Sequence, residues 1–276
     1  MDQVFTITFS ECVENHAGMQ KIGQLASSGF TYQDLVHAKE WFEERGGVCE
    51  IHHLNQLYDG EPTENAYVLV ARKGLNLLID DGSADDFYRE QTPLEKDTKA
   101  LMRGRVVNKK ARYNLCFADK GQEPDYENGK GRIIPFGDVP ILNGVRNKLA
   151  EILKESLMAE GNYYYDVNKC YISYHGDGER KRVVGIRTGR DWPLHYQWFL
   201  RSEPVGKRLE LVLGHGDVYI MSQKAVGTDW LKKVIPTLRH AAGYASVLKL
   251  EGPVIKSCKI VYALDDDGCA EIKPQH

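Results

Sequence analysis

The sequence predicts an α+β protein, with a double-stranded β-helix (jelly-roll) core after an N-terminal α/β extension. Two observations lead to this fold class. Short strand-like segments follow one another at regular spacing from residue 163 onward, which is typical of a β-sandwich or barrel. Residues 1–100 instead alternate strand-like and helix-like patterns. We therefore expect an N-terminal region at 1–100, whose role the pattern does not define, and a jelly-roll domain at 101–276.

The first elements are predicted from alternation and from helix start and stop signals. Residues Val4 to Phe9 alternate as a strand does, and Gly18 to Ala26 favours a short helix that ends at Ser27-Ser28-Gly29. Thr31 is a suitable N-cap for a helix over Asp34 to Glu44. Further strands are expected at Val48 to Leu57 and Ala66 to Ala71.

The second region begins with a basic stretch and continues into one strong helix. Asn143 to Met158 carries an apolar stripe at helical spacing, so we expect a helix that packs on the core. The strands predicted after it are Lys169 to Tyr174, Arg182 to Arg187, His195 to Leu200, Arg208 to Leu213, Asp217 to Met221, Ala245 to Leu250 and Val254 to Ala263.

Charge and composition limit the classes of function. The 276 residues carry a formal net charge of -3, so any contact with nucleic acid must use a local basic surface. The basic segment 103–112 is followed by the aromatic residues Tyr113 and Phe117, and could follow a phosphate backbone. The same pattern also fits a half-exposed strand, and both interpretations stay open.

The cysteines and the apolar runs indicate the environment of the chain. Six cysteines are scattered without a CxxC pair, which disfavours a zinc finger and favours buried free thiols. The longest apolar runs are too short to span a bilayer, and the first residues do not have the pattern of a leader peptide. We therefore expect a soluble intracellular protein that does not insert into a membrane.

The string His175-Gly176-Asp177 carries the clearest chemical signal. In an extended segment, residues two apart point to the same side, so both side chains can reach one metal ion. Together with one distant histidine they would form the two-His-one-carboxylate triad of non-haem iron oxygenases. The alternative is an ordinary surface turn that happens to contain His and Asp.

A second His-x-Asp string, His215-Gly216-Asp217, competes with the first. Only 23 residues separate Asp217 from His240, whereas 63 separate Asp177 from His240. The longer interval accommodates the several strands of a jelly roll, so we prefer His175 and Asp177 with His240 as third ligand, and keep His215 as the alternative. His195 lies in an aromatic strand and is expected to be a packed core or rim histidine.

The block from Asn162 to Gly243 resembles the catalytic core of AlkB-like 2-oxoglutarate oxygenases. Asn162-Tyr163-Tyr164 is similar to the family's Asn-x-Tyr, and His175-Gly176-Asp177-Gly178-Glu179 is similar to its metal pair followed by an acidic residue. The run Leu213 to Met221 resembles the strand that precedes the last metal ligand. The resemblance covers about the last 175 residues.

The resemblance implies Fe(II), 2-oxoglutarate and O2 as cofactor and co-substrates. It places Asn162 and Tyr164 against 2-oxoglutarate, with Lys249 where the family has an arginine, and Glu179 and Arg180 beside the substrate. It also shows a departure, because Lys233 stands where the family's third histidine would fall.

The activity implied by the resemblance is hydroxylation or demethylation at a substrate C–H, with a modified nucleobase of DNA or RNA as the favoured substrate. A protein- or small-molecule-directed hydroxylase and a catalytically inactive jelly-roll binding module are the alternatives. The string Glu14-Asn15-His16 is interpreted either as part of a polar pocket or as a helix cap.

Overall fold

The computed structural model describes the backbone of residues 2–264 and 270–273 and the side chains of residues 2–260. Two large sheets and a few helices form the molecule, and in the described part of the chain neither sheet closes into a barrel. The predicted mixture of helices and sheets is confirmed at this level. Among the described helices, none has the length and apolar character that a membrane crossing requires.

The larger sheet has eight strands in the order β4-β5-β15-β12-β1-β10-β8-β9. Its strands are β1 (Val4–Ser10), β4 (Val48–His53), β5 (Tyr67–Arg72), β8 (Tyr113–Ala118), β9 (Ile133–Pro135), β10 (Met158–Tyr164), β12 (Val183–Gly189) and β15 (Val218–Met221).

The smaller sheet has the order β11-β16-β13-β14-β17. Its strands are β11 (Ile172–His175), β13 (Trp192–Leu200), β14 (Glu203–Leu213), β16 (Thr237–Ala242) and β17 (Val254–Ile255). Three small hairpins complete the strands: β2 (Cys12–Glu14) with β3 (Lys21–Gly23), β6 (Lys99–Met102) with β7 (Arg105–Asn108), and β18 (Val261–Leu264) with β19 (Ala270–Lys273).

The helices are short, apart from two. They are α1 (Tyr32–Glu43), α2 (Leu75–Leu78), α3 (Ala84–Gln91), α4 (Pro140–Leu153), α5 (Gln223–Val226) and α6 (Ala245–Leu248). Thr31 caps α1 as predicted, in a reciprocal capping box with Asp34. Helix α4 begins earlier than expected because Pro140 suits the first turn, and it ends earlier because Lys154 adopts a left-handed conformation.

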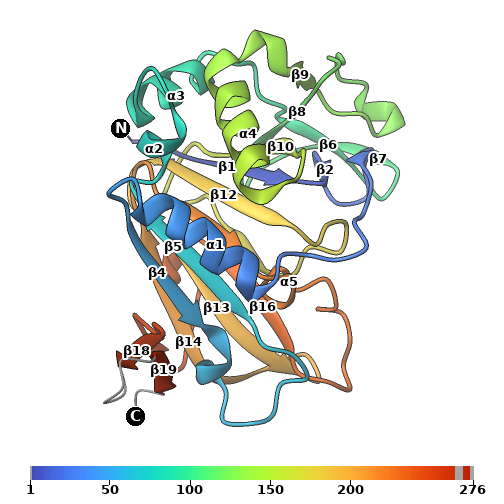
Figure 1. The fold of residues 1–276 in the computed structure, drawn as a ribbon. Helices are drawn as coiled ribbons and strands as arrows, with labels where there is room; N and C mark the ends of the chain where they lie inside the picture. The colour runs from blue at the N-terminus through green and yellow to red at the C-terminus, as the bar shows by residue number, and fades with distance from the viewer. Residues whose placement is uncertain (1, 265–269, 274–276) are drawn as a thin grey trace.

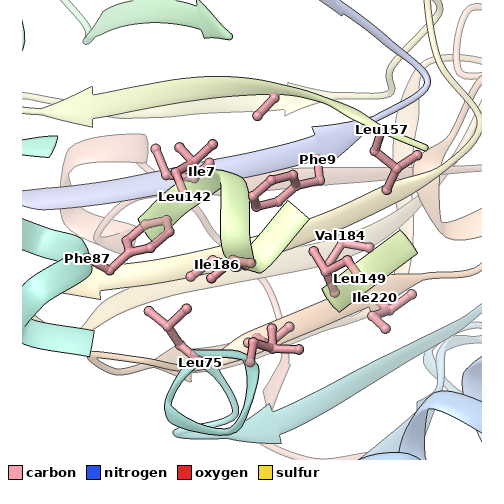
Figure 2. Close-up of a cluster of buried hydrophobic side chains, with 14 of the residues drawn as sticks. Ile7, Phe9, Leu75, Phe87, Leu142, Leu149, Leu157, Val184, Ile186 and Ile220 are labelled. Atoms are coloured by element: carbon pink, nitrogen blue, oxygen red, sulfur yellow. The ribbon is translucent and has the colours of Figure 1, made fainter. Parts of the chain in front are cut away.

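Side-chain alternation gives the larger sheet two different faces. The odd residues of β1, including Ile7 and Phe9, join an apolar core with Ile186 of β12. Figure 2 shows these side chains packed with Leu142 and Leu149 of helix α4. The even residues, Thr6 and Thr8, line a cavity on the opposite face of the sheet. The alternation of side chains along β1 thus places apolar residues on the helix-covered face of the sheet and polar residues on the cavity face.

A second apolar core lies between the two sheets. Val68 and Val70 of β5 cluster there with Trp198 of β13 and Leu211 of β14. Trp198 also donates its indole N–H to the carbonyl of Leu54 at 2.8 Å. This core fixes the two sheets face to face at one end, and the polar cavity lies where Thr6 and Thr8 face the smaller sheet.

The position of β1 links the two regions expected from the sequence. β1 pairs antiparallel with β10 on one side and with β12 on the other, so the N-terminal strand lies between two strands of residues 101–276. β5 likewise pairs with β15. The larger sheet therefore contains strands from residues 1–100 and from residues 101–276.

Two predicted elements are wrong. Gly18 to Ala26 is not helical: β3 pairs with β2, and Gly18 and Gly23 both have positive φ, which a helix does not accommodate. Ala245 to Leu250 forms the short helix α6, not a strand, because the chain turns sharply at Gly243 after β16. The strand predicted at Val254 to Ala263 is also split, between β17 and β18.

The cysteines of the described residues are free thiols, as expected. They are Cys12, Cys49, Cys116, Cys170 and Cys258. Cys269 lies outside the described residues.

Candidate metal-binding site

His175, Asp177 and His240 come together at one end of the smaller sheet. His175 is the last residue of β11, and β11 pairs antiparallel with β16 so that His175 lies opposite His240. Asp177 follows two residues later. One potential ligand atom from each of the three residues lies within 4.8 Å of the others, and this is the metal-ligand group found among the described residues. We call it the His-Asp-His cluster.

Local hydrogen bonds orient the ligand atoms. The Nδ1 of His175 lies 2.8 Å from the carbonyl of Ser173, which accepts a hydrogen bond from that nitrogen, so that Nε2 is the nitrogen turned toward the cluster. The Nε2 of His175 is 3.4 Å from Oδ1 of Asp177, and Nε2 of His240 is 3.8 Å from the same oxygen. All three donor atoms therefore face a common point.

The glycine between His175 and Asp177 is required by its neighbours. A Cβ on Gly176 would lie 2.0 Å from the carbonyl oxygen of Gly227, which no side chain could occupy. The backbone N–H of Asp177 donates to the carbonyl of Val226 at 3.1 Å. The segment after α5 thus holds the His-x-Asp turn in place.

Charge and burial favour a metal-ready state of the cluster. Burial lowers the pKa of His240 to about 3, so its imidazole is neutral at physiological pH. Burial opposes the ionisation of Asp177, but the Arg180 guanidinium is the largest of the influences that outweigh it and hold the pKa of Asp177 below its usual range. Neutral imidazoles and an ionised carboxylate are the forms that bind divalent metals.

The competing histidines have structural partners instead. His215 accepts a hydrogen bond from the backbone N–H of Gly189 at 3.0 Å. Asp217 accepts from Arg72 and from the backbone N–H groups of Lys73 and Gly214. His195 is buried against the carbonyl of Gly243, as expected of a core histidine. The choice of His175, Asp177 and His240 agrees with this geometry.

The His-Asp-His cluster opens into a cavity of about 470 Å³ between the sheets. Asn162, Tyr164, Glu179 and Arg180, all singled out from the sequence, line it. Lys249 does not line it: this residue follows α6, has a left-handed φ of 54° and is exposed. The chain after His240 turns away from the larger sheet, so Lys249 is not brought to the cluster.

Arg187, a cation that the sequence interpretation missed, lines the cavity. Arg187 of β12 is 1% exposed, lines the cavity, and has no carboxylate partner among the described residues. Its Nη1 donates to the carbonyl of Trp192 at 3.1 Å, while its buried Nε has no hydrogen-bond partner. A buried guanidinium without a carboxylate partner gives this part of the cavity wall a positive charge, which favours an anion.

The larger sheet presents Arg187 within a row of polar residues. Thr6 of β1 lies opposite Arg187 on one side and Asn162 of β10 on the other. The hydroxyl of Thr6 is buried without a partner. Tyr219 of β15 covers Gly185, whose added Cβ would lie 1.9 Å from the tyrosine ring. The strand register therefore brings these polar residues together on the cavity face of the sheet, although they are far apart in the sequence.

Two predicted basic residues point inward. Lys109 donates to Asn114 and to both the carbonyl and the side chain of Asn15. Arg112 lines the cavity and donates from Nε to Asn162 at 2.5 Å. Within segment 103–112 the exposed arginines are Arg103 and Arg105, on the β6–β7 hairpin.

The fold and the site define a mixed α/β protein with a His-Asp-His cluster inside a polar cavity. No family model matches the sequence. The chain is 51% identical over 251 residues to an uncharacterized protein of Acanthamoeba polyphaga mimivirus, and the match covers 90% of this chain and 98% of the viral protein. The chain belongs to the same protein family as that viral protein.

Proposed function

We propose that this protein is an iron(II)- and 2-oxoglutarate-dependent oxygenase of the AlkB-like kind, built on a jelly-roll core. The observation that carries the proposal is the His-Asp-His cluster, whose two imidazoles and one carboxylate match the donor set of non-haem iron oxygenases. The chain also crosses repeatedly between the two sheets, since β10, β12 and β15 lie in one and β11, β13 and β16 in the other. That crossing pattern supports the jelly-roll interpretation.

His175, Asp177 and His240 would hold the metal, leaving its other positions to co-substrate and oxygen. Bound iron(II), with 2-oxoglutarate and O2, supplies oxidation of a substrate C–H to C–OH, and an N-methyl carbon would then leave as formaldehyde. The hydrogen bond from Nδ1 of His175 to Ser173 orients the ring so that Nε2 is the nitrogen that would bind the metal. Arg180 keeps Asp177 ionised.

Arg187 is the proposed partner of the distal carboxylate of 2-oxoglutarate, in place of Lys249. Its buried Nε has no hydrogen-bond partner among the described residues, and the unpartnered hydroxyl of Thr6 lies beside it in the strand register. Asn162 and Tyr164 line the same cavity and would bound the co-substrate. Apolar residues, including Leu194 and Val183, limit the water around it.

A modified nucleobase remains the proposed substrate. Segment 103–112 begins at the exposed Arg103 and Arg105 and ends at Arg112 in the cavity wall. Cations in this order would let a phosphate backbone lie along the hairpin while one base enters the cavity.

Anaerobic titration tests the proposal. Adding iron(II) and then 2-oxoglutarate is expected to produce the weak visible charge-transfer absorption of the chelated metal, and His175→Ala should abolish it. Identical spectra from wild type and His175→Ala would reject the oxygenase. Succinate release with methylated oligonucleotides, compared with methylated peptides, then tests the substrate class.

A further inference from the structure

The loop between α5 and β16 carries the two most exposed large apolar side chains among the described residues. Leu231 is 72% exposed and Val234 is 88% exposed, and the exposed Lys232 and Lys233 lie between them. In Figure 1 this segment leaves the body of the molecule as a loop. We call Leu231, Lys232, Lys233 and Val234 the loop tip. Single exposed apolar residues are ordinary, but two so close together indicate a contact surface.

Trp230 joins the loop tip to the wall of the cavity. It is half-buried and lines the cavity that holds the His-Asp-His cluster. A Cβ added to Gly176 would lie 2.8 Å from the Cβ of Trp230, so the two backbones are in close contact. The backbone N–H of Trp230 donates to the carbonyl of Gly227 at 2.9 Å. The loop tip therefore begins directly beside the cavity.

Further contacts hold the loop on both sides of the tip. Lys224 of α5 pairs with Asp229 at 2.8 Å, and the carbonyl of Asp229 accepts from the backbone N–H of Lys232 at 2.9 Å. On the other side, Arg201 in the β13–β14 turn donates its backbone N–H to the carbonyl of Lys233 at 3.2 Å. The fold thus presents the apolar side chains of the tip to solvent on a fixed backbone, as a preorganised contact does.

The loop tip lies in positively charged surroundings. Lys232, Lys233 and Arg201 are exposed, and within the described part of the chain none of them forms a salt bridge. The exposed carboxylates nearby are Glu203, in the same hairpin as Arg201, and Glu64, which shares a shallow pocket with Lys232. Three unpaired cations thus outnumber two carboxylates, and the surface favours an anionic partner.

We propose that the loop tip docks on an anionic phospholipid surface, with Leu231 and Val234 among the acyl chains and the lysines at the headgroups. Aliphatic side chains gain by transfer into hydrocarbon, and lysine can bury its stem while its ammonium group contacts phosphate. Trp230 at the base of the tip suits the interface between the two layers. A nucleic acid fits less well, because single-stranded bases bind by stacking on aromatic rings, which the tip lacks.

This docking does not depend on the proposed oxygenase chemistry. It is peripheral binding through a loop, which is distinct from insertion of a membrane-spanning segment. Because Trp230 belongs both to the loop and to the cavity wall, docking would hold the cavity next to the lipid surface.

Vesicle flotation with the full-length protein tests the proposal. Wild type is expected to float with phosphatidylcholine vesicles in which phosphatidylserine makes up about one third of the lipid, and not with phosphatidylcholine alone. Each lysine replaced should weaken binding about five-fold, so Lys232→Gln combined with Lys233→Gln should weaken it about 25-fold. Leu231→Gln combined with Val234→Gln should weaken it at least about ten-fold on the same vesicles.

Two matched variants serve as controls. Val48→Gln replaces an aliphatic side chain on β4 that is 68% exposed, and Lys120→Gln replaces an exposed lysine outside the loop. Both should float as wild type does. If a double variant does not fold by circular dichroism, the single change Val234→Gln takes its place and should still weaken flotation. Wild type that stays unbound, equal flotation on neutral and anionic vesicles, or double variants that float like wild type would overturn the proposal.

A nucleic-acid partner for the loop tip is a separate outcome. Anisotropy of a labelled single-stranded oligonucleotide is expected to be the same with wild type and with the Leu231→Gln, Val234→Gln variant. Weaker oligonucleotide binding by that variant, without vesicle binding by wild type, would assign the tip to nucleic acid and overturn the lipid proposal. Intact flotation with a failed iron and 2-oxoglutarate titration would overturn the oxygenase assignment alone.

Discussion

The chain contains the tripeptide His-Gly-Asp twice, and the two copies have different surroundings. His175-Gly176-Asp177 lies beside His240, and its carboxylate is shared between two imidazoles. In the other copy, Asp217 accepts from Arg72 and from two backbone N–H groups, so its oxygens are already satisfied. The ability to hold a metal therefore depends on which strand lies alongside, because the tripeptide itself is the same.

Two arginines of the larger sheet, Arg72 and Arg187, show a similar contrast. Arg72 is bound by Asp217 and Glu50. Arg187 contacts the carbonyl of Trp192 and the side chain of Tyr219, has no carboxylate partner among the described residues, and its Nε is unpartnered. Saturated charges stabilise a fold, whereas unsaturated buried charges mark a binding site.

The largest expected effect is on metal binding. Losing an outer-shell partner of a metal ligand typically weakens binding by about 10- to 100-fold, so losing a ligand should exceed this. His240→Ala and Asp177→Ala are therefore expected to weaken iron(II) binding by more than about 100-fold in anaerobic calorimetry. His215→Ala is the matched control and should leave the affinity unchanged. Equal losses at both copies would contradict the assignment.

The next largest effect concerns the two cations considered as anchors for 2-oxoglutarate. Arg187→Gln should weaken 2-oxoglutarate binding by about 30-fold or more, because a buried charge-assisted pair is lost. Arg187→Lys keeps the charge but not the fork, and should recover part of the affinity. Lys249→Ala is expected to change nothing, since the residue is exposed outside the cavity. Titration of the charge-transfer band measures all three, and a loss with Lys249→Ala would reverse this choice.

The sequence was informative where local pattern decides structure. Alternation in Val4 to Phe9 predicted a strand, and Thr31 predicted a helix start, because both signals are local. The proximity of His175 and Asp177 follows from residue spacing, and that of His240 from the length of chain needed to return to them. Arg187 could not be found in this way, since its role depends on pairing with β1.

The N-terminal strand explains the error at Lys249. A resemblance to a family places the anchor on the chain segment after the last ligand. Here that segment turns into α6, and β1 occupies the position between β10 and β12. Pairing between residues this far apart leaves no local sequence signal. One sequence feature did connect the N-terminal region with the cavity. Glu14-Asn15-His16 was interpreted as part of a polar pocket or as a helix cap, and these residues follow β1 and line the cavity.

A smaller effect should appear in stability at the second copy. Asp217→Asn keeps the shape of the side chain but weakens its ion pair with Arg72, which is 2.8 Å long and partly exposed. We expect the free energy of unfolding to fall by about 2 kcal/mol, which is the typical contribution of a hydrogen bond to a charged group. Urea denaturation measures it, with iron(II) affinity as the control that should not move. Unchanged stability would show that the hydrogen bonds of Asp217 do not stabilise the fold.

The last prediction compares a satisfied carboxylate with an unsatisfied one through the pH dependence of stability. Burial raises the pKa of Glu14 to about 7, with Glu179 and Glu160 adding to the rise and Lys21 and Arg180 opposing it. The unfolded chain releases this proton near pH 4.5, but the folded chain keeps it until about pH 7, so folding stability falls over that interval and stays lower above it.

Glu14→Gln removes this dependence because an amide does not ionise. The melting temperature of the variant should therefore equal that of wild type near pH 4.5 and exceed it increasingly up to pH 7, with a constant difference above. Thermal denaturation in a pH series measures the difference, and Glu127→Gln provides a surface glutamate for comparison. A variant that melts below wild type by a margin that grows as the pH rises would instead mean that Glu14 is stabilised as a carboxylate by a partner within the fold.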